Sequence, residues 1–283
     1  MKKVAIEIVK CIQEQVKNAT ASGVIVGLSG GVDSSLVAVL CKEAYPEKVL
    51  GLIMPCHSIP KDRVHAELVA AKYNIPIRVI DLSSIYDAFA RLMENAPEII
   101  SHGVQVNNVI DTALTLGDAA GVLCKDKPAM ALANLKPRLR MLALYYHANM
   151  MNYLVAGTGN KSEATMGYFT KYGDGGVDIL PIGELLKTEV GKMAKVLGIP
   201  DEIIIKPPSA GLWEGQTDED EMGISYETLD RVILAIESGS PENTSNINPQ
   251  MLAKVQAAMC QSEHKRRLPL VCLVPRNGTD SLS

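Results

Sequence analysis

The sequence predicts an α/β protein with an open, mostly parallel, twisted sheet and helices on both faces of that sheet. Short runs of β-branched and other apolar residues alternate along the chain with longer segments of helical periodicity. Strands that alternate with helices in this way favour parallel pairing through helical crossovers. The 283 residues, 47% of them hydrophobic, are sufficient for one large α/β domain, and we expect a single domain over residues 1–283.

The first third of the chain is expected to supply three strands in βαβαβ order, preceded by an amphipathic helix. Val4, Ile8 and Val16 recur at helical spacing in that leading helix, and charged residues fill its opposite face. The elements expected in order are a helix over residues 2–18, a strand over 23–26, a helix through 36–40, a strand over 48–54, a helix over 60–73, a strand over 77–80 and a helix over 84–94. In such sheets, ligands bind beyond the carboxyl ends of the strands.

The rest of the chain predicts one more strand among several helices. A helix over 130–150 contains Pro137, and because proline inside a helix costs about 3 kcal/mol, we expect the helix proper to start near that residue. A strand over 152–156 and helices over 187–197, 226–237 and 249–262 follow, whereas residues 95–129 show only broken helical character. Proline, glycine and acidic residues gather toward 207–223, so we expect a mobile lid near residues 205–223.

Composition argues against nucleic-acid and membrane partners. The net charge is −4 and the pI about 5.8, so the chain lacks the basic excess typical of nucleic-acid-binding proteins, and aromatic residues for base stacking are scarce. No apolar segment has the length of a membrane span or the form of a signal-peptide core. The six cysteines form no C-x-x-C pair. We therefore expect a cytoplasmic protein without a cysteine-based metal or redox centre.

One turn between a predicted strand and a predicted helix has the chemistry of an anion-binding loop. It comprises Gly27, Leu28, Ser29, Gly30, Gly31, Val32, Asp33 and Ser34. Gly30 and Gly31 permit positive φ and let the backbone approach a ligand closely. The N–H groups and the dipole at the start of the following helix favour negative charge. This turn therefore predicts a phosphate-binding site.

Asp33 distinguishes this turn from the common P-loop, in which a lysine follows the glycines. A carboxylate beside phosphate oxygens repels them unless a metal ion lies between the two groups. Asp33 therefore implies Mg²⁺ bound jointly by the protein and by phosphate. The alternative is an ordinary glycine-rich turn in which Asp33 only caps the helix.

The turn resembles the pyrophosphate loop of the N-type ATP pyrophosphatases, which split ATP into AMP and pyrophosphate. Four further segments extend the resemblance to the ammonia-dependent NAD synthetases. With Ser29–Ser34, these segments follow the family's order over nearly the whole chain, and they are Gly157–Glu163, Phe169–Gly175, Lys206–Leu212 and His264–Arg266. The run Phe-Thr-Lys-Tyr-Gly-Asp-Gly at 169–175 is the most specific of them. The resemblance implies the adenine nucleotide alpha-hydrolase-like, Rossmann-like form of the α/β fold.

The resemblance also implies a function, that of a ligase forming C–N bonds. Members of the family convert nicotinic acid adenine dinucleotide (deamido-NAD) to NAD with ammonia, through an acyl adenylate. ATP is the co-substrate, AMP and pyrophosphate are released, and Mg²⁺ is the implied cofactor. A homodimer is the implied assembly. Only one predicted helix precedes the first strand, so we expect no glutaminase domain and take ammonia as the nitrogen source.

Roles follow from the resemblance position by position. ATP binding is assigned to the eight residues of the turn, Gly27 to Ser34, together with Thr158, Lys187 and Ser209, and Mg²⁺ binding to Asp33 and Glu163. Deamido-NAD binding is assigned to Arg138, Lys171, Asp178, His264 and Lys265. The catalytic residues are Asp33, Lys187 and Asp174, and Asp174 would help to accept a proton from ammonium.

Alternatives remain open at this stage, for single residues and for the function. Glu163, Lys187 and the basic run 264–267 could each be solvated surface groups, Lys171 and Asp174 could pair with one another, and Arg138 or Arg140 could be structural. One rival function is that of another N-type ATP pyrophosphatase acting on a different substrate, such as a tRNA-modifying or GMP-forming synthetase. The other rival is a non-catalytic module that binds adenine nucleotides.

Overall fold

The computed structural model describes residues 1–94, 127–213, 215–240 and 247–272. The elements up to the first gap are α1 (Lys2–Asn18), β1 (Gly23–Gly27), α2 (Val32–Ala44), β2 (Val49–Ile53), α3 (Pro60–Lys72), β3 (Ile77–Val79) and α4 (Ser83–Glu94). Beyond that gap lie α6 (Lys127–Ala133), α7 (Leu135–Met151), β4 (Tyr153–Ala156), α8 (Lys161–Met166), α9 (Lys187–Leu197), α10 (Asp201–Ile204), α11 (Asp218–Met222), α12 (Tyr226–Ser238), α14 (Pro249–Gln261) and a short 3₁₀ helix (Glu263–Lys265).

The four strands form one parallel sheet in the order β3-β2-β1-β4, which confirms the predicted fold class. Val24 at the centre of the sheet pairs with Val49 of β2 on one side and with Leu154 of β4 on the other. Because every pair is parallel, all four carboxyl ends lie at one edge of the sheet. The loops that follow the strands therefore meet at this edge, where ligands bind in open α/β sheets.

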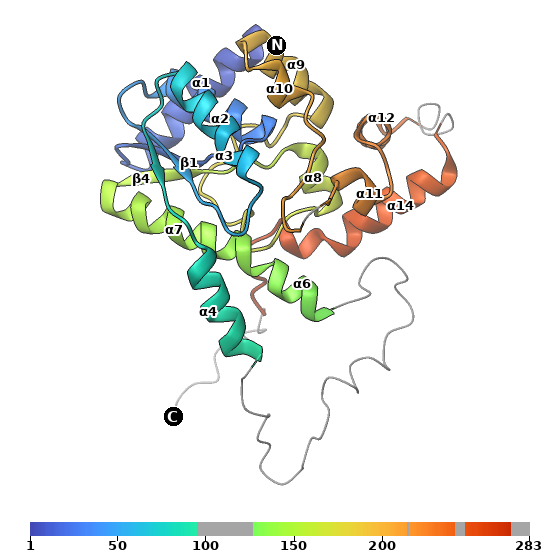
Figure 1. Cartoon of the computed structure of the whole chain (residues 1–283). Coiled ribbons are helices and arrows are strands. Elements are labelled where there is room, and N and C mark those ends of the chain that lie inside the picture. The colour runs from blue at the N-terminus through green and yellow to red at the C-terminus, as the bar shows by residue number, and fades with distance from the viewer. Residues whose placement is uncertain (95–126, 214, 241–246, 273–283) are drawn as a thin grey trace, which may run out of the picture.

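Helices cover both faces of the sheet because alternate residues of its buried strands point to opposite sides. Val24 and Val26 belong to the hydrophobic cluster formed with α1, α2, α3 and α9, whereas Ile25 belongs to the cluster on the side of α7. In Figure 1, α7 runs beneath the sheet, opposite α1 and α2. Burial of each of these aliphatic side chains contributes about 2 kcal/mol to folding.

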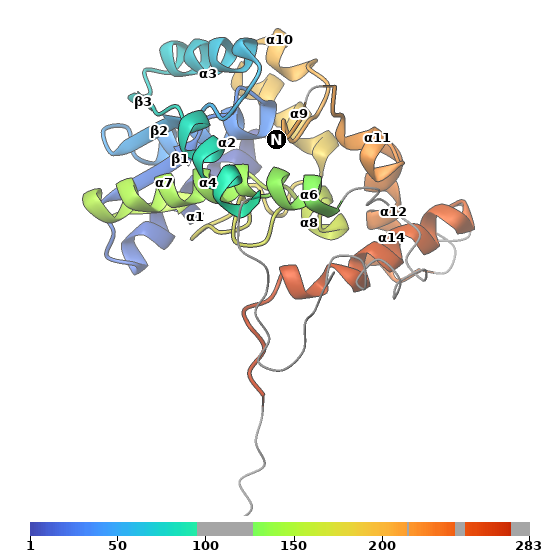
Figure 2. The same ribbon diagram turned by 60° about the horizontal axis from the view of Figure 1, so that its bottom comes forward.

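The C-terminal helices form a third cluster at the side of the sheet (Figure 2). Leu229 and Val232 of α12 and Val255 of α14 are fully buried in it, together with Met222 of α11. The cluster extends to Leu186, the residue before α9. It thus connects α11, which lies in the segment predicted to be a lid, to the start of α9.

The predicted helix over 130–150 is in fact two helices. α6 ends at Ala133 and α7 begins at Leu135, which confirms the expected start of the main helix near Pro137, its third residue. Proline is tolerated there because an N–H in the first helical turn has no intrahelical acceptor. Most of the segment 95–129, in which only broken helical character was expected, lies outside the described residues. In the described part of the chain, no helix combines the length and apolar character needed to cross a bilayer.

Candidate active site

A cavity of about 700 Å³ opens at the carboxyl edge of the sheet. It is lined by the loop after β1, by the loops after β2 and β4, and by residues 206–212 of the predicted lid segment. Its size falls in the usual range for small-molecule sites. The lining includes all the turn residues of 27–34 except Gly30, together with Thr158, Glu163, Asp174, Lys187, Ser209 and Lys265 from the predicted set.

The turn after β1 is held by its own serines and by close packing on α3. The Ser34 hydroxyl donates to the Gly31 carbonyl at 3.1 Å and accepts from the Ser29 amide at 3.2 Å. Gly30 has φ +77°, and a Cβ on it would lie 2.1 Å from the Asp62 carbonyl oxygen, so only glycine fits. With the loop fixed in this way, the amides of the first turn of α2 face the cavity without intrahelical acceptors.

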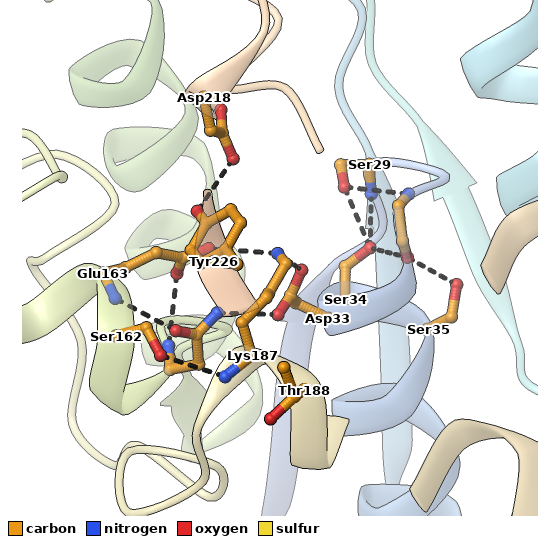
Figure 3. A network of polar contacts seen from close by, with 12 residues as sticks. Ser29, Asp33, Ser34, Ser35, Ser162, Glu163, Lys187, Thr188, Asp218 and Tyr226 are labelled. Carbon is orange, nitrogen blue, oxygen red and sulfur yellow. Dashed lines mark hydrogen bonds and ion pairs between the residues drawn. The ribbon is translucent and has the colours of Figure 1, made fainter. Parts of the chain in front are cut away.

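Asp33 is not the helix cap. The N-cap of α2 is Gly31, and no side chain caps it. Asp33 instead points away from its own helix, and its Oδ2 lies 2.6 Å from Lys187 Nζ. Lys187 Nζ also lies 3.3 Å from Glu163 Oε1, so one ammonium group joins two carboxylates that are 130 residues apart in sequence (Figure 3). The site therefore brings together the three groups assigned to metal and phosphate.

Glu163 is placed by a capping box at the start of α8. The Asn160 side chain accepts the Glu163 amide at 3.0 Å, and the Glu163 carboxylate accepts the Asn160 amide at 3.2 Å. Asn160 then uses its side-chain N–H₂ to donate to Asp33 Oδ1 at 2.9 Å. Asn160 thus hydrogen-bonds both carboxylates, Asp33 of α2 and Glu163 of α8, and holds them close together.

The charges at this point favour a bound cation. Burial raises the pKa of Glu163 to about 7, the Lys187 ammonium opposes this shift, and the nearby Asp33 carboxylate adds to it. Burial alone would lower the pKa of Lys187, but Asp33 and Glu163 outweigh it and raise that pKa above its ordinary value. A cation, the Lys187 ammonium, already lies between two hard oxygen donors of the kind that Mg²⁺ prefers, so the residues fit this metal.

The two carboxylates would not complete a metal site by themselves. Among the described residues, no group of three or more His, Cys, Asp or Glu side chains is arranged to hold a metal ion. The remaining ligands would have to come from water or from phosphate oxygens, as Mg²⁺ sites in nucleotide-dependent enzymes commonly use. The arrangement is therefore suited to a metal that arrives with a phosphorylated substrate.

Comparison with known proteins assigns this architecture to a family. The sequence model of the family NAD synthase matches residues 4–269. The chain belongs to the NAD synthase family. An NH(3)-dependent NAD(+) synthetase of Carboxydothermus hydrogenoformans is 46% identical over 265 residues, which cover 94% of this chain and 95% of the relative. As a member of the NAD synthase family, the protein is an enzyme, a ligase.

Two solved structures of this family agree with the fold. The NMN synthetase of Francisella tularensis has a TM-score of 0.78 and 31% identity, covering 96% of this chain and 98% of its own. The NH3-dependent NAD synthetase of Campylobacter jejuni, solved in complex with the nitrate ion, has a TM-score of 0.74 and 29% identity, with the same coverage of both chains. The family resemblance on which the sequence analysis relied is thereby confirmed.

In this NAD synthase family member, Asp174 and Lys265 line the cavity from the 167–175 loop and from the C-terminal 3₁₀ helix. Asp174 Oδ1 accepts the Thr170 amide at 2.9 Å, and enclosure by the cavity walls raises the pKa of its carboxyl. Lys265 donates to the carbonyls of Gly167 and Phe169 at 2.8 and 3.0 Å. Asp174 does not pair with Lys171, whose ammonium donates to the His264 carbonyl instead.

Four of the residues assigned to deamido-NAD lie outside this cavity: Arg138, Lys171, Asp178 and His264. Asp178 accepts the Val155 amide at 2.7 Å and the Tyr145 hydroxyl at 2.9 Å, which fixes the edge of β4. Arg140 rather than Arg138 lines the cavity, and it donates to the Met54 carbonyl at 3.1 Å and to Ser58 Oγ at 3.2 Å. The structure leaves their substrate roles as predictions.

Sequence reasoning missed Asp230, a buried carboxylate on α12 that is 3% exposed. Its Oδ1 accepts the Ser162 hydroxyl, and its Oδ2 accepts the Thr188 amide at 2.9 Å. Ser162 in turn accepts the Lys187 amide at 3.0 Å. Asp230 therefore joins the first turns of α8 and α9, which carry Glu163 and Lys187. No local motif marks this residue, because its partners lie 68 and 42 positions away in sequence.

Replacing Asp230 with alanine is expected to destabilise the protein by about 3 kcal/mol, because the buried Ser162 hydroxyl and the partly buried Thr188 amide lose their acceptor. Urea denaturation measures the loss. The matched control is Asp220→Ala, which removes an exposed carboxylate bonded only locally to Thr217 and should change stability by less than about 1 kcal/mol. Equal losses of stability from the two substitutions would show that Asp230 does not stabilise the junction of α8 and α9.

Proposed function

We propose that the protein is an ammonia-dependent NAD synthetase that converts deamido-NAD to NAD with ATP and ammonia, through an acyl adenylate, and releases AMP and pyrophosphate. The observation that supports this most is the meeting of Asp33, Glu163 and Lys187 beside the N-terminus of α2. A nucleotide-binding module without catalysis would need an anion cradle only. Two carboxylates beside this anion-binding turn can hold a metal ion, which an enzyme that cleaves a metal-bound triphosphate requires.

The binding of ATP follows from the geometry of the turn. The first-turn amides and the dipole of α2 hold the two departing phosphates, and Asp33 with Glu163 would hold Mg²⁺ against their oxygens. When bound, the metal neutralises charge that develops on the pyrophosphate leaving group. Lys187 supplies a second positive charge to the phosphates, and Ser209 supplies a hydroxyl from the lid. Catalysis of the first step rests on positioning and electrostatics.

The second step needs ammonia rather than ammonium, because only the neutral form carries the nucleophilic lone pair. We assign Asp174 as the group that accepts the proton. Its carboxyl lines the cavity, and the raised pKa makes it a stronger base than an ordinary aspartate. Lys265, whose charge opposes this rise in pKa, lies close enough to stabilise the carboxylate between turnovers.

A steady-state assay tests the proposal. The enzyme is supplied with ATP, Mg²⁺, ammonium and deamido-NAD, and NAD and AMP are expected in equal amounts. Nicotinic acid mononucleotide is tested in parallel, since the Francisella tularensis relative is an NMN synthetase. Preference for the mononucleotide would correct the substrate and keep the chemistry. ADP in place of AMP, or no turnover with either substrate, would contradict the proposal.

We also propose that the enzyme is a cytoplasmic homodimer that pairs through α7. Leu142, Tyr146 and Met150 are 63%, 62% and 70% exposed, and their spacing of four residues places them in one stripe along the helix. Arg138 precedes the stripe by the same spacing and therefore lies at its end. A dimer formed here would bring Arg138 to the interface, which accounts for a substrate residue that does not line its own cavity.

Tyr146→Glu is expected to convert the dimer to a monomer, because it places a charge at the centre of this apolar stripe. Light scattering at assay concentration measures the mass, and the KM for deamido-NAD should rise by about tenfold or more as the shared site is lost. Leu234→Glu, at another exposed leucine on α12, is the matched control and should stay dimeric. A monomeric wild type that is fully active would contradict the proposal.

A further inference from the structure

Asp218 of the lid helix α11 has a carboxylate oxygen without a partner. The residue is 4% exposed, yet it lines the cavity beside Lys187. Its Oδ2 accepts the Tyr226 hydroxyl at 3.0 Å, whereas Oδ1 is buried and makes no hydrogen bond to any described residue. The hydroxyl of the neighbouring Tyr168 also faces Asp218, but it has a single hydrogen, which it donates to Glu221 at 2.7 Å, so one donor serves two carboxylates. A buried acceptor in this state is costly unless another state of the protein satisfies it.

Tyr226 links Asp218 to Lys187. The Lys187 ammonium lies 5.0 Å from the centre of the Tyr226 ring, and the hydroxyl of that ring reaches Asp218 (Figure 3). Asp218 follows Asp33 and Glu163 among the carboxylates whose charges raise the pKa of Lys187. The Lys187 ammonium therefore lies near three carboxylates. It forms ion pairs with Asp33 and Glu163, and the third, Asp218, has an oxygen without a hydrogen-bond partner.

A divalent cation on Asp33 and Glu163 would compete with the Lys187 ammonium for the same oxygens. Lysine has a flexible four-carbon stem and three N–H donors, so it can change partners without a movement of the backbone. A largely buried ammonium that lost both counter-ions would be strongly unfavourable. Among the described residues that line the cavity near Lys187, the Asp218 carboxylate offers a buried negative charge with an oxygen that makes no hydrogen bond.

We propose that Asp218 receives the Lys187 ammonium when a divalent cation binds Asp33 and Glu163, so that metal binding is coupled to the closed lid through one lysine. The inference rests on the metal role that the proposed function gives to Asp33 and Glu163. One N–H of the ammonium would bond Asp218, and the other two would remain for phosphate oxygens. Asp218 is a positioning residue in this scheme, because it acts through Lys187.

The lid geometry fits this coupling. The Asp218 amide donates to the Pro208 carbonyl at 3.0 Å, next to Ser209, and the lid carbonyl of Leu212 accepts the buried Lys136 ammonium at 2.6 Å. Through this backbone bond, the position of Asp218 is linked to that of residues 206–212, which line the same cavity. Metal binding would favour the closed lid, and by linkage a closed lid would favour metal binding to the same extent.

A double-mutant cycle on metal affinity tests the inference without using activity. Mn²⁺ binding to the full-length protein is measured from the electron paramagnetic resonance signal of free Mn²⁺. Asp218→Asn is expected to weaken Mn²⁺ binding about tenfold, because Lys187 then stays on Asp33 and Glu163. Lys187→Gln is expected to tighten Mn²⁺ binding. In that background, Asp218→Asn should weaken Mn²⁺ binding by less than about threefold, which is the direct effect of losing the Asp218 charge.

The controls separate this inference from a structural role and from the proposed function. Glu221→Gln changes the neighbouring lid carboxylate, which Tyr168 and Gln216 already satisfy, and should show equal effects with and without Lys187. Suppose that Asp33→Asn abolishes Mn²⁺ binding, but Asp218→Asn weakens it equally with and without Lys187. That result would overturn this inference and leave the proposed function standing. If Asp33→Asn leaves Mn²⁺ binding unchanged, the metal role in the proposed function fails and the inference fails with it.

Discussion

The Asp33→Asn enzyme is expected to fold normally but to form AMP at least about 10³-fold more slowly than the wild type. Asparagine is nearly isosteric with aspartate, and its side-chain oxygen can still accept the Asn160 amide that now bonds Asp33 Oδ1 at 2.9 Å. What the substitution removes is the negative charge, which is needed to hold Mg²⁺ against the phosphates. Release of AMP and pyrophosphate, measured with and without ammonium, reports the adenylation step directly.

A second carboxylate of the cavity serves as the control. Asp81 also lines the cavity, and its Oδ1 accepts a hydrogen bond from the Ser83 amide at 2.8 Å, just before α4. The side-chain oxygen of asparagine can make the same local bond, so Asp81→Asn should keep its turnover within about twofold of the wild type. Normal turnover in Asp33→Asn would rule out the metal role. Thermal unfolding of both variants shows whether either loss reflects misfolding.

The fold was predictable because its local patterns agree with its packing. β1, β2 and β4 are apolar runs bounded by glycine, proline or polar residues, and each lies in the buried part of the sheet. α1, α3 and α9 also appeared close to the expected bounds, whereas α2 extends four residues beyond the expected 36–40 at each end. Parallel order followed from the alternation of strands and helices. The short edge strand β3 was found as well, although its side chains are exposed.

Helix boundaries were less predictable where capping decides them. No helix was predicted between residues 157 and 186, yet α8 begins at Lys161. The signal was present, since Asn160 and Glu163 have the spacing of a capping box. The break between α6 and α7 at Asn134 lies three residues before Pro137, where proline chemistry had predicted the start of the helix proper.

The residues of the candidate site also differ in how far they could be predicted from the sequence. The residues of the turn after β1 were accessible to sequence reasoning because one short segment carries its whole chemistry. Asp218 and Asp230 were not, because each acts through partners on other elements: Tyr226 for the first, and Ser162 and Thr188 for the second. An aspartate on an amphipathic helix looks the same in sequence whether it faces water or a buried amide. Only the packing of α12 on α8 and α9 distinguishes these cases.

Lys187→Gln is expected to lower the rate of adenylation by about 10³-fold, because glutamine reaches the phosphates but carries no charge to offset theirs. The free enzyme should also lose about 2 kcal/mol of stability, since Asp33 and Glu163 are left facing one another without a cation. Single-turnover formation of AMP measures the first effect and urea denaturation the second. Lys192→Gln, at an exposed lysine of the same helix, is the matched control and should change neither.

The two losses respond differently to metal, and this difference identifies the cause. A divalent cation can replace the missing ammonium between Asp33 and Glu163, so added Mn²⁺ should stabilise Lys187→Gln more than it stabilises the wild type. It cannot replace the charge that Lys187 delivers to the phosphates, so the rate should stay low at saturating metal. A variant that recovers both stability and rate with metal would show that Lys187 only fills the cation site. A variant that retains full turnover without added metal would show that the lysine takes no part in the chemistry.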